Sequence, residues 1–154
     1  GQIDLIIFVV SMIALIAVEL FIRKSRAGLA IRGASFDLEA TSLMGVNVQK
    51  LILIVFMIAG SLAGLAGALL GAKYTAFPTL GTAMTNKAFI SSVFGGLGSI
   101  PGAVLGAILL GVGETMIASY VSSSMRDIFA YLLLVIVLFV RPSGLMGKEA
   151  EDKA

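Results

Sequence analysis

The residue types that carry most enzyme chemistry are missing from this sequence, which holds no histidine and no cysteine in 154 residues. A histidine general base, a thiol nucleophile and a thiolate metal site are therefore excluded. No pair of carboxylates stands at a spacing that predicts a catalytic cleft. The net charge of +2 is too small to indicate nucleic-acid binding. We expect no catalytic residue, no metal site and no cofactor bound by this chain itself.

Glu114 is the acidic residue with the most unusual setting, because it lies deep inside the apolar stretch 103–120. Burying an ionised group in a membrane is costly, so an intramembrane acid is a candidate functional residue. The small neighbours Gly111, Gly113 and Thr115 could admit water or another helix. Two interpretations stay open: Glu114 is an ion or proton site, or its carboxyl hydrogen-bonds a neighbouring helix.

The run GGLGSIPG, residues 95–102, is the second unusual feature. It resembles a nucleotide-binding loop, but the Lys-Ser/Thr pair that should follow such glycines is missing. Four glycines and a proline in eight positions disfavour a continuous helix. The apolar run before them, 88–94, would cover only about 10 Å as a helix, too little to cross a bilayer. We predict a glycine-broken or re-entrant helix over 88–120, with a tight surface turn between two spans as the alternative.

The composition indicates the class of protein that contains these features. Apolar residues make up 58% of the chain and charged residues 13%, whereas soluble domains carry roughly 25% charge. An ordinary soluble enzyme, a disordered chain and a small secreted scaffold are excluded. We predict an all-α, polytopic transmembrane helical bundle that is part of a single transmembrane domain. Its spans are expected at 3–22, 51–72, 88–120 (broken) and 125–140.

The start of the chain at Gly1 carries neither an initiator methionine nor a basic leader. We therefore expect a piece of a longer membrane protein. Of the eleven basic residues, Lys73, Lys87 and Arg126 fall on the predicted outer side and the other eight on the inner side. The positive-inside rule then places the C-terminus in the cytoplasm.

The loop 23–50 is expected on the cytoplasmic side and contains a short helix from Phe36 to Met44. Ser35 is predicted to cap this helix and Gly45 to end it in a left-handed conformation. Asp37 and Glu39 fall in its first turn, where acids are favourable.

The apolar residues of this short helix, at positions 36, 40, 43 and 44, share one face. The face could lie on lipid or dock into a cytoplasmic protein. Acids on the polar side favour the protein partner.

Three stretches resemble one family in the order that family shows. They are RAGLAIRGASFDLEATSLMGVNVQKLILIVFMIAGSLAGLAGALLG, AFISSVFGGLGSIPGAVLGAILLGVGET and FVRPSGLMG, residues 26–71, 88–115 and 139–147. Together they resemble the permease subunits of branched-chain amino acid ABC importers, in the H-type form of the two-permease pair. Family chains are about twice this long, so the resemblance is to a C-terminal half.

The resemblance implies a multi-pass subunit of the bacterial inner membrane, embedded in the lipid bilayer. Its implied partners are a second permease, cytoplasmic ATPases that hold ATP and Mg, and a periplasmic substrate-binding protein. The implied substrates are branched-chain or related amino acids, and relatives that carry amides or urea leave the choice open. ATP hydrolysis would occur on the ATPase, so the chain is expected to be a transport subunit and not an enzyme.

The resemblance also implies roles for individual residues. The segment 26–45 matches the loop that couples to the ATPase, and the glycine break matches a segment near the translocation pathway. The coupling candidates are Arg32, Phe36, Asp37, Glu39, Leu43, Met44 and Gly45. The pathway candidates are Gly95, Gly96, Gly98, Ser99, Pro101, Gly102 and, from its own position, Glu114.

Two other functional classes remain as alternatives. A gradient-driven secondary carrier or channel would use Glu114 as its ion or proton site. A structural membrane subunit would have no pathway of its own and would tolerate bulky substitutions at Gly96 or Gly98.

Overall fold

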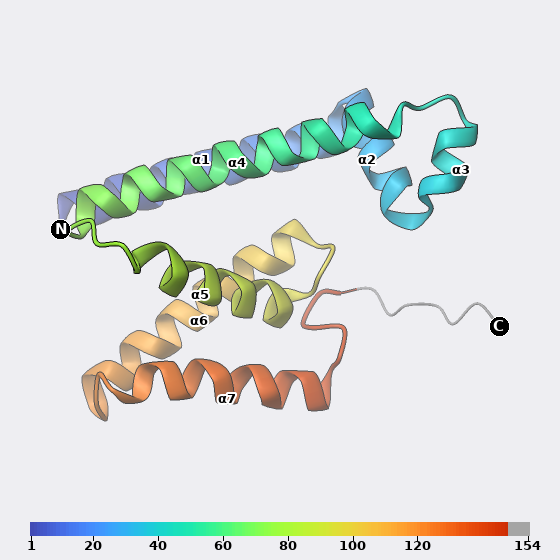
Figure 1. Ribbon diagram of the computed structural model, residues 1–154. Coiled ribbons are helices and arrows are strands. Elements are labelled where there is room, and N and C mark those ends of the chain that lie inside the picture. The colour runs from blue at the N-terminus through green and yellow to red at the C-terminus, as the bar shows by residue number, and fades with distance from the viewer. Residues whose placement is uncertain (148–154) are drawn as a thin grey trace. The chain divides into compact units, whose positions relative to one another are not determined.

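The computed structural model describes residues 1–147 and divides into two compact units, Gly1–Phe77 and a second unit that begins at Pro78. Throughout the described range the elements are α-helices joined by short connections (Figure 1). The predicted all-α class is therefore confirmed.

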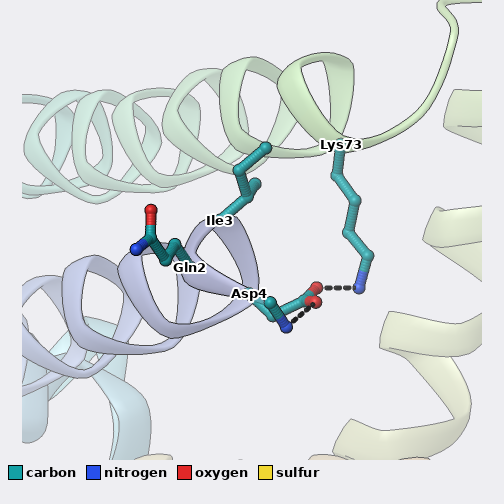
Figure 2. A pocket seen from close by; sticks show the side chains of 5 residues that line it. Gln2, Ile3, Asp4 and Lys73 are labelled. Atoms are coloured by element: carbon teal, nitrogen blue, oxygen red, sulfur yellow. Dashed lines mark hydrogen bonds and ion pairs between the residues drawn. The ribbon is translucent and has the colours of Figure 1, made fainter.

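The first unit is built on two long helices, α1 (Gln2–Lys24) and α4 (Val48–Lys73), which pack side by side (Figure 1). They run antiparallel, because Asp4 near the start of α1 pairs with Lys73 at the end of α4, with 2.5 Å between Oδ1 and Nζ (Figure 2). Helix α1 has no buried residue and α4 buries Leu51 alone. Their apolar side chains therefore face outward, as expected for helices whose solvent is lipid or another subunit.

Two short helices, α2 (Arg26–Phe36) and α3 (Leu38–Leu43), connect the long pair. The chain bends at Ser25, which adopts an extended conformation and caps α2 by accepting a 2.8 Å hydrogen bond from the Gly28 N–H. A side chain at Gly28 would collide with the backbone of Ile22. Glycine there lets α2 fold back closely on the end of α1.

The second unit packs α5 (Leu80–Gly95), α6 (Ile100–Tyr120) and α7 (Met125–Val140) against one another. Ile90, Leu110 and Ala130, one from each helix, form its buried apolar cluster, and Leu134 packs against them. This cluster fixes which faces of the three helices meet.

Helices α1, α4 and α6 are long and apolar enough to cross a membrane. Helices α5 and α7 have 16 residues each, which is about 24 Å against a hydrocarbon core of about 30 Å. The helix 125–140 was predicted with these bounds. How the segment 88–120 crosses the membrane stays a prediction.

The first half of the broken segment is longer than predicted. Helix α5 begins at Leu80, whereas the broken segment was expected to begin at residue 88. Hydropathy misses this part because Asn86 and Lys87 are polar. Lys87 is accommodated inside the unit by a pairing with Glu114, which sequence alone does not reveal.

Candidate coupling and translocation sites

The coupling segment has two helices where one was predicted. Asp37 separates α2 from α3, and its carboxylate caps α3 by accepting hydrogen bonds from the Glu39 and Ala40 N–H groups, at 2.9 and 3.0 Å. The predicted cap, Ser35, lies inside α2 and donates its hydroxyl to the Arg32 carbonyl instead. The prediction of a Ser35 cap was wrong because the residues before it already continue the helix that Ser25 begins.

The three apolar coupling candidates stand exposed: Phe36 by 79%, Leu43 by 84% and Met44 by 84%. Phe36 ends α2, whereas Leu43 ends α3 and Met44 follows it, so they do not form the single helical face predicted. Gly45 has φ +86°, the left-handed conformation expected of it. The structure therefore presents a short, locally capped segment with apolar side chains projecting from it.

The two remaining coupling candidates carry charge. Arg32 donates from Nη2 to the carbonyl of Arg23, 3.3 Å away, and so ties α2 to the end of α1. Glu39 is exposed in the first turn of α3. Their roles at an interface stay predictions.

The glycine break is a tight turn, residues 96–99, between α5 and α6. Gly96 and Gly98 have φ of +107° and +87°, conformations that L side chains rarely adopt. Ser99 caps α6 by accepting from the Gly102 N–H at 3.2 Å, and Pro101 follows in the first turn. Gly96, Gly98, Ser99 and Pro101 thus each have a conformational reason for their type.

Glycines also let α5 and α6 approach at backbone distance. A Cβ at Gly106 would lie 2.5 Å from the Ser91 carbonyl oxygen and 2.9 Å from the Gly95 nitrogen. A Cβ at Gly95 would collide with the Gly102 carbonyl, and the reverse holds as well. Close packing, not flexibility, is what these glycines supply to the described part of the chain.

The segment after α7 packs against the glycine break and hydrogen-bonds the end of α5, although it lies about fifty residues later in the sequence. Leu145 and Met146 donate their N–H groups to the carbonyls of Phe94 and Gly95, each at 3.0 Å. These carbonyls lie at the end of α5, where no later helical turn can satisfy them. A Cβ at Gly144 would lie 2.5 Å from the Gly96 nitrogen. The two motifs GGLGSIPG and RPSGLMG therefore form one structural unit, which sequence reasoning treated as separate.

Glu114 is buried to 8% exposure and its Oε2 accepts a hydrogen bond from the Lys87 Nζ at 2.8 Å. The other carboxylate oxygen, Oε1, has no hydrogen-bond partner within residues 1–147. Lys87 lies before the predicted start of the broken segment, and the structure corrects this by placing it in α5. The free-energy cost of burying a carboxylate is offset in part when a cation pairs with it. Any pathway role of Glu114 stays a prediction.

A cavity of about 180 Å³ lies beside this ion pair, between α5 and α7. Its wall consists of Ala83, Asn86, Lys87, Ile90, Asp127, Ala130 and Tyr131. Among the described residues no group of three or more acidic residues could hold a metal ion.

Comparison with known proteins identifies the family that this chain resembles. The family described as branched-chain amino acid transport system, permease component, matches residues 2–138. No solved structure matches the chain.

Individual relatives agree with the family. The high-affinity branched-chain amino acid permease LivH of Salmonella typhimurium is 40% identical over 96% of this chain and 48% of its own length. The corresponding permease BraD of Pseudomonas aeruginosa is 40% identical over 97% of this chain and 49% of its own. The guanosine ABC transporter permease NupP of Bacillus subtilis is 32% identical over 88% of this chain and 40% of its own length.

The chain spans about half the length of the curated relatives it matches. Its helices, its glycine-rich turn and the motif after α7 all lie within or beside the matched region, which ends at residue 138. The chain belongs to the family of permease components of branched-chain amino acid transport systems.

Proposed function

We propose that this chain is the C-terminal half of a permease subunit that moves branched-chain or related amino acids across the bacterial inner membrane, driven by separate ATPases. The observation that carries the proposal is the α2–α3 segment. It lies between two helices of membrane-spanning length and exposes Phe36, Leu43 and Met44. Exposed apolar groups on a connection outside the membrane-length helices are typical of a surface that docks another protein.

The choice of substrate is supported by the relatives. LivH and BraD, at 40% identity, are named for branched-chain amino acids, whereas NupP is named for guanosine and is 32% identical. Higher identity favours the amino acids. The complete transporter would add a second permease, cytoplasmic ATPases that bind ATP and Mg, and a periplasmic binding protein.

If the α2–α3 segment docks on an ATPase, a charge added to its exposed apolar groups should disrupt the coupling. In the full-length permease, assembled with its ATPases, Leu43→Asp should uncouple ATP hydrolysis from uptake, because a carboxylate would have to be buried in the interface. Radiolabelled leucine uptake and ATPase activity are measured together in proteoliposomes. Ser42→Asp is the matched control, since it adds the same charge to an exposed neighbouring position. Unchanged coupling in Leu43→Asp, or a permease that never co-purifies with an ATPase, contradicts the proposal.

A gradient-driven carrier or channel is the second candidate. The observation that favours it is the Oε1 of Glu114, which has no hydrogen-bond partner among residues 1–147. The Lys87 contact weighs against it, because a carboxylate already neutralised by lysine is a poor site for a coupling ion. A carrier predicts uptake that protonophores abolish while ATP is present, and strong loss of uptake in Glu114→Gln. Uptake that follows ATP and ignores protonophores excludes it.

A further inference from the structure

The cavity between α5 and α7 is lined by both apolar and charged side chains. Ile90 and Ala130 are 3% and 2% exposed and belong to the buried cluster of the unit. Lys87 and Asp127 lie on its wall and carry opposite charges. A small molecule with an apolar body and both charges at one end would find a complement for each part.

The wall is built from one face of each helix. Ala83, Lys87 and Ile90 follow one another at i, i+4 and i+7 along α5, which places them on the same side. Asp127 and Tyr131 are four positions apart on α7 and face them. Two regular helices hold these groups, so their spacing does not depend on a loop.

Lys87 keeps donors for a ligand although it is paired. An ammonium group offers three donors, and one of them goes to Glu114 Oε2. Glu114 also balances the lysine charge inside the unit, which leaves Asp127 to face a positive group of the ligand. The wall therefore offers N–H donors to a carboxylate at Lys87 and a carboxylate acceptor to an ammonium group at Asp127, so each charged group of a zwitterion has a partner.

The volume matches such a ligand. The cavity measures about 180 Å³, and a cavity of roughly 150 Å³ admits a benzene-sized molecule. A single amino acid with a small branched side chain is of this order, whereas a nucleoside is considerably larger.

We propose that this cavity is a binding subsite for a zwitterionic amino acid with an apolar side chain. Lys87 takes the carboxylate, Asp127 takes the ammonium group, and the side chain lies towards Ile90 and Ala130. The inference rests on the proposed function for the choice of an amino acid. Lys87 and Arg126 were assigned to the outer side by charge counting, so the subsite would receive substrate from that side.

Protection of an introduced thiol tests the subsite directly. The chain holds no cysteine, so Ala83→Cys in a full-length permease otherwise free of cysteine gives one reactive site on the cavity wall. Leucine, added to the assembled transporter without its binding protein, should slow alkylation by a maleimide severalfold. Tyr120→Cys is the control: Tyr120 is 84% exposed and outside the cavity, so leucine should leave its alkylation unchanged.

Charge removal then assigns the contacts. With Ala83→Cys present, Asp127→Asn should raise the leucine concentration for half-protection about tenfold, since one charge-assisted hydrogen bond of about 1.4 kcal/mol is lost. Lys87→Gln combined with Glu114→Gln should do the same without stranding a buried charge. Tyr120→Phe, outside the cavity, should leave the half-protection concentration unchanged.

The outcomes separate the two proposals. If the transporter takes up leucine but leucine never slows alkylation at position 83, the subsite is wrong and the proposed function stands. If protection survives both charge removals unchanged, the subsite is wrong as well. If no amino acid is taken up at all, the proposed function fails, and protection at position 83 still decides whether an amino acid binds.

Discussion

Two interruptions between helices, at Asp37 and at residues 96–99, lie next to candidate functional residues and are stabilised by different means. At Asp37, between α2 and α3, one side chain caps the next helix through neighbouring N–H groups. At residues 96–99, between α5 and α6, the free carbonyls at the end of α5 are satisfied by Leu145 and Met146, far along the sequence. The first interruption is local and the second depends on tertiary structure.

This difference extends to exposure. The segment around Asp37 projects Phe36, Leu43 and Met44 outward. The segment around the glycine turn buries Gly95, where no side chain fits. The cap at Asp37 is formed by residues next to it in the sequence, although α2 itself is held to the end of α1 by Arg32 and by the close approach at Gly28. The glycine turn cannot move without breaking the packing of α5, α6 and the chain after α7.

The largest expected effect comes from adding one methyl group to the packed interface. Gly106→Ala would place Cβ 2.5 Å from the Ser91 carbonyl oxygen. Since helix backbones stand on both sides, we expect a loss of about 3 kcal/mol in the free energy of unfolding. Unfolding of the full-length permease in mixed micelles measures it.

Gly111→Ala is the matched control for this substitution. Gly111 lies in the same helix with nothing within 4 Å of an added Cβ. Alanine there should be neutral or should stabilise by about 0.5 kcal/mol, because it loses less backbone freedom than glycine. Equal stability of the two variants would contradict close packing of α5 on α6.

The turn itself allows backbone strain to be separated from tertiary contact. Gly96 and Gly98 both have positive φ, but a Cβ at Gly96 would also lie 2.8 Å from the Gly147 Cα, whereas Gly98 has open space. Gly98→Ala should therefore cost about 1 kcal/mol for the left-handed conformation alone. Gly96→Ala should cost about 2 kcal/mol, because the chain after α7 is displaced as well.

Transport measurements on the same two variants bear on function. We expect Gly96→Ala to reduce leucine uptake more than Gly98→Ala at equal amounts of folded permease. If bulky substitutions at both positions leave uptake intact in a folded protein, the chain is a structural subunit without a pathway.

The sequence predicted those parts of the fold that depend on local patterns. Apolar runs indicated the helices α1, α4 and α7. Glycines together with a proline indicated the interruption near residue 96. It missed the start of α5, because Asn86 and Lys87 lower the hydropathy of a segment that tertiary contacts make helical. That Lys87 belongs to a packed unit can be recognised only once its partner, Glu114, is known.

The sites show the same division. Gly45 was recognised from its residue type, since a left-handed end of a helix favours glycine. The pairing of Lys87 with Glu114 and the contact of Leu145 with Phe94 join distant residues, and no local pattern encodes them. An acid in an apolar stretch is one signal that could have prompted a search for a basic partner on a neighbouring helix.

The smallest expected effect tests how local the first interruption is. Asp37→Ala removes the cap of α3, so about 1 kcal/mol of local stability should be lost. Hydrogen exchange of the Glu39 and Ala40 amides in the full-length permease should then accelerate about fivefold, whereas the global free energy of unfolding should hardly change. Ser35→Ala is the matched control, because within residues 1–147 Ser35 caps no helix and its hydroxyl donates to the exposed Arg32 carbonyl. If Ser35→Ala accelerates exchange in α3 as much as Asp37→Ala, the cap is misassigned. If Asp37→Ala also destabilises the second unit, the two interruptions are coupled and the segment around Asp37 is not independently closed.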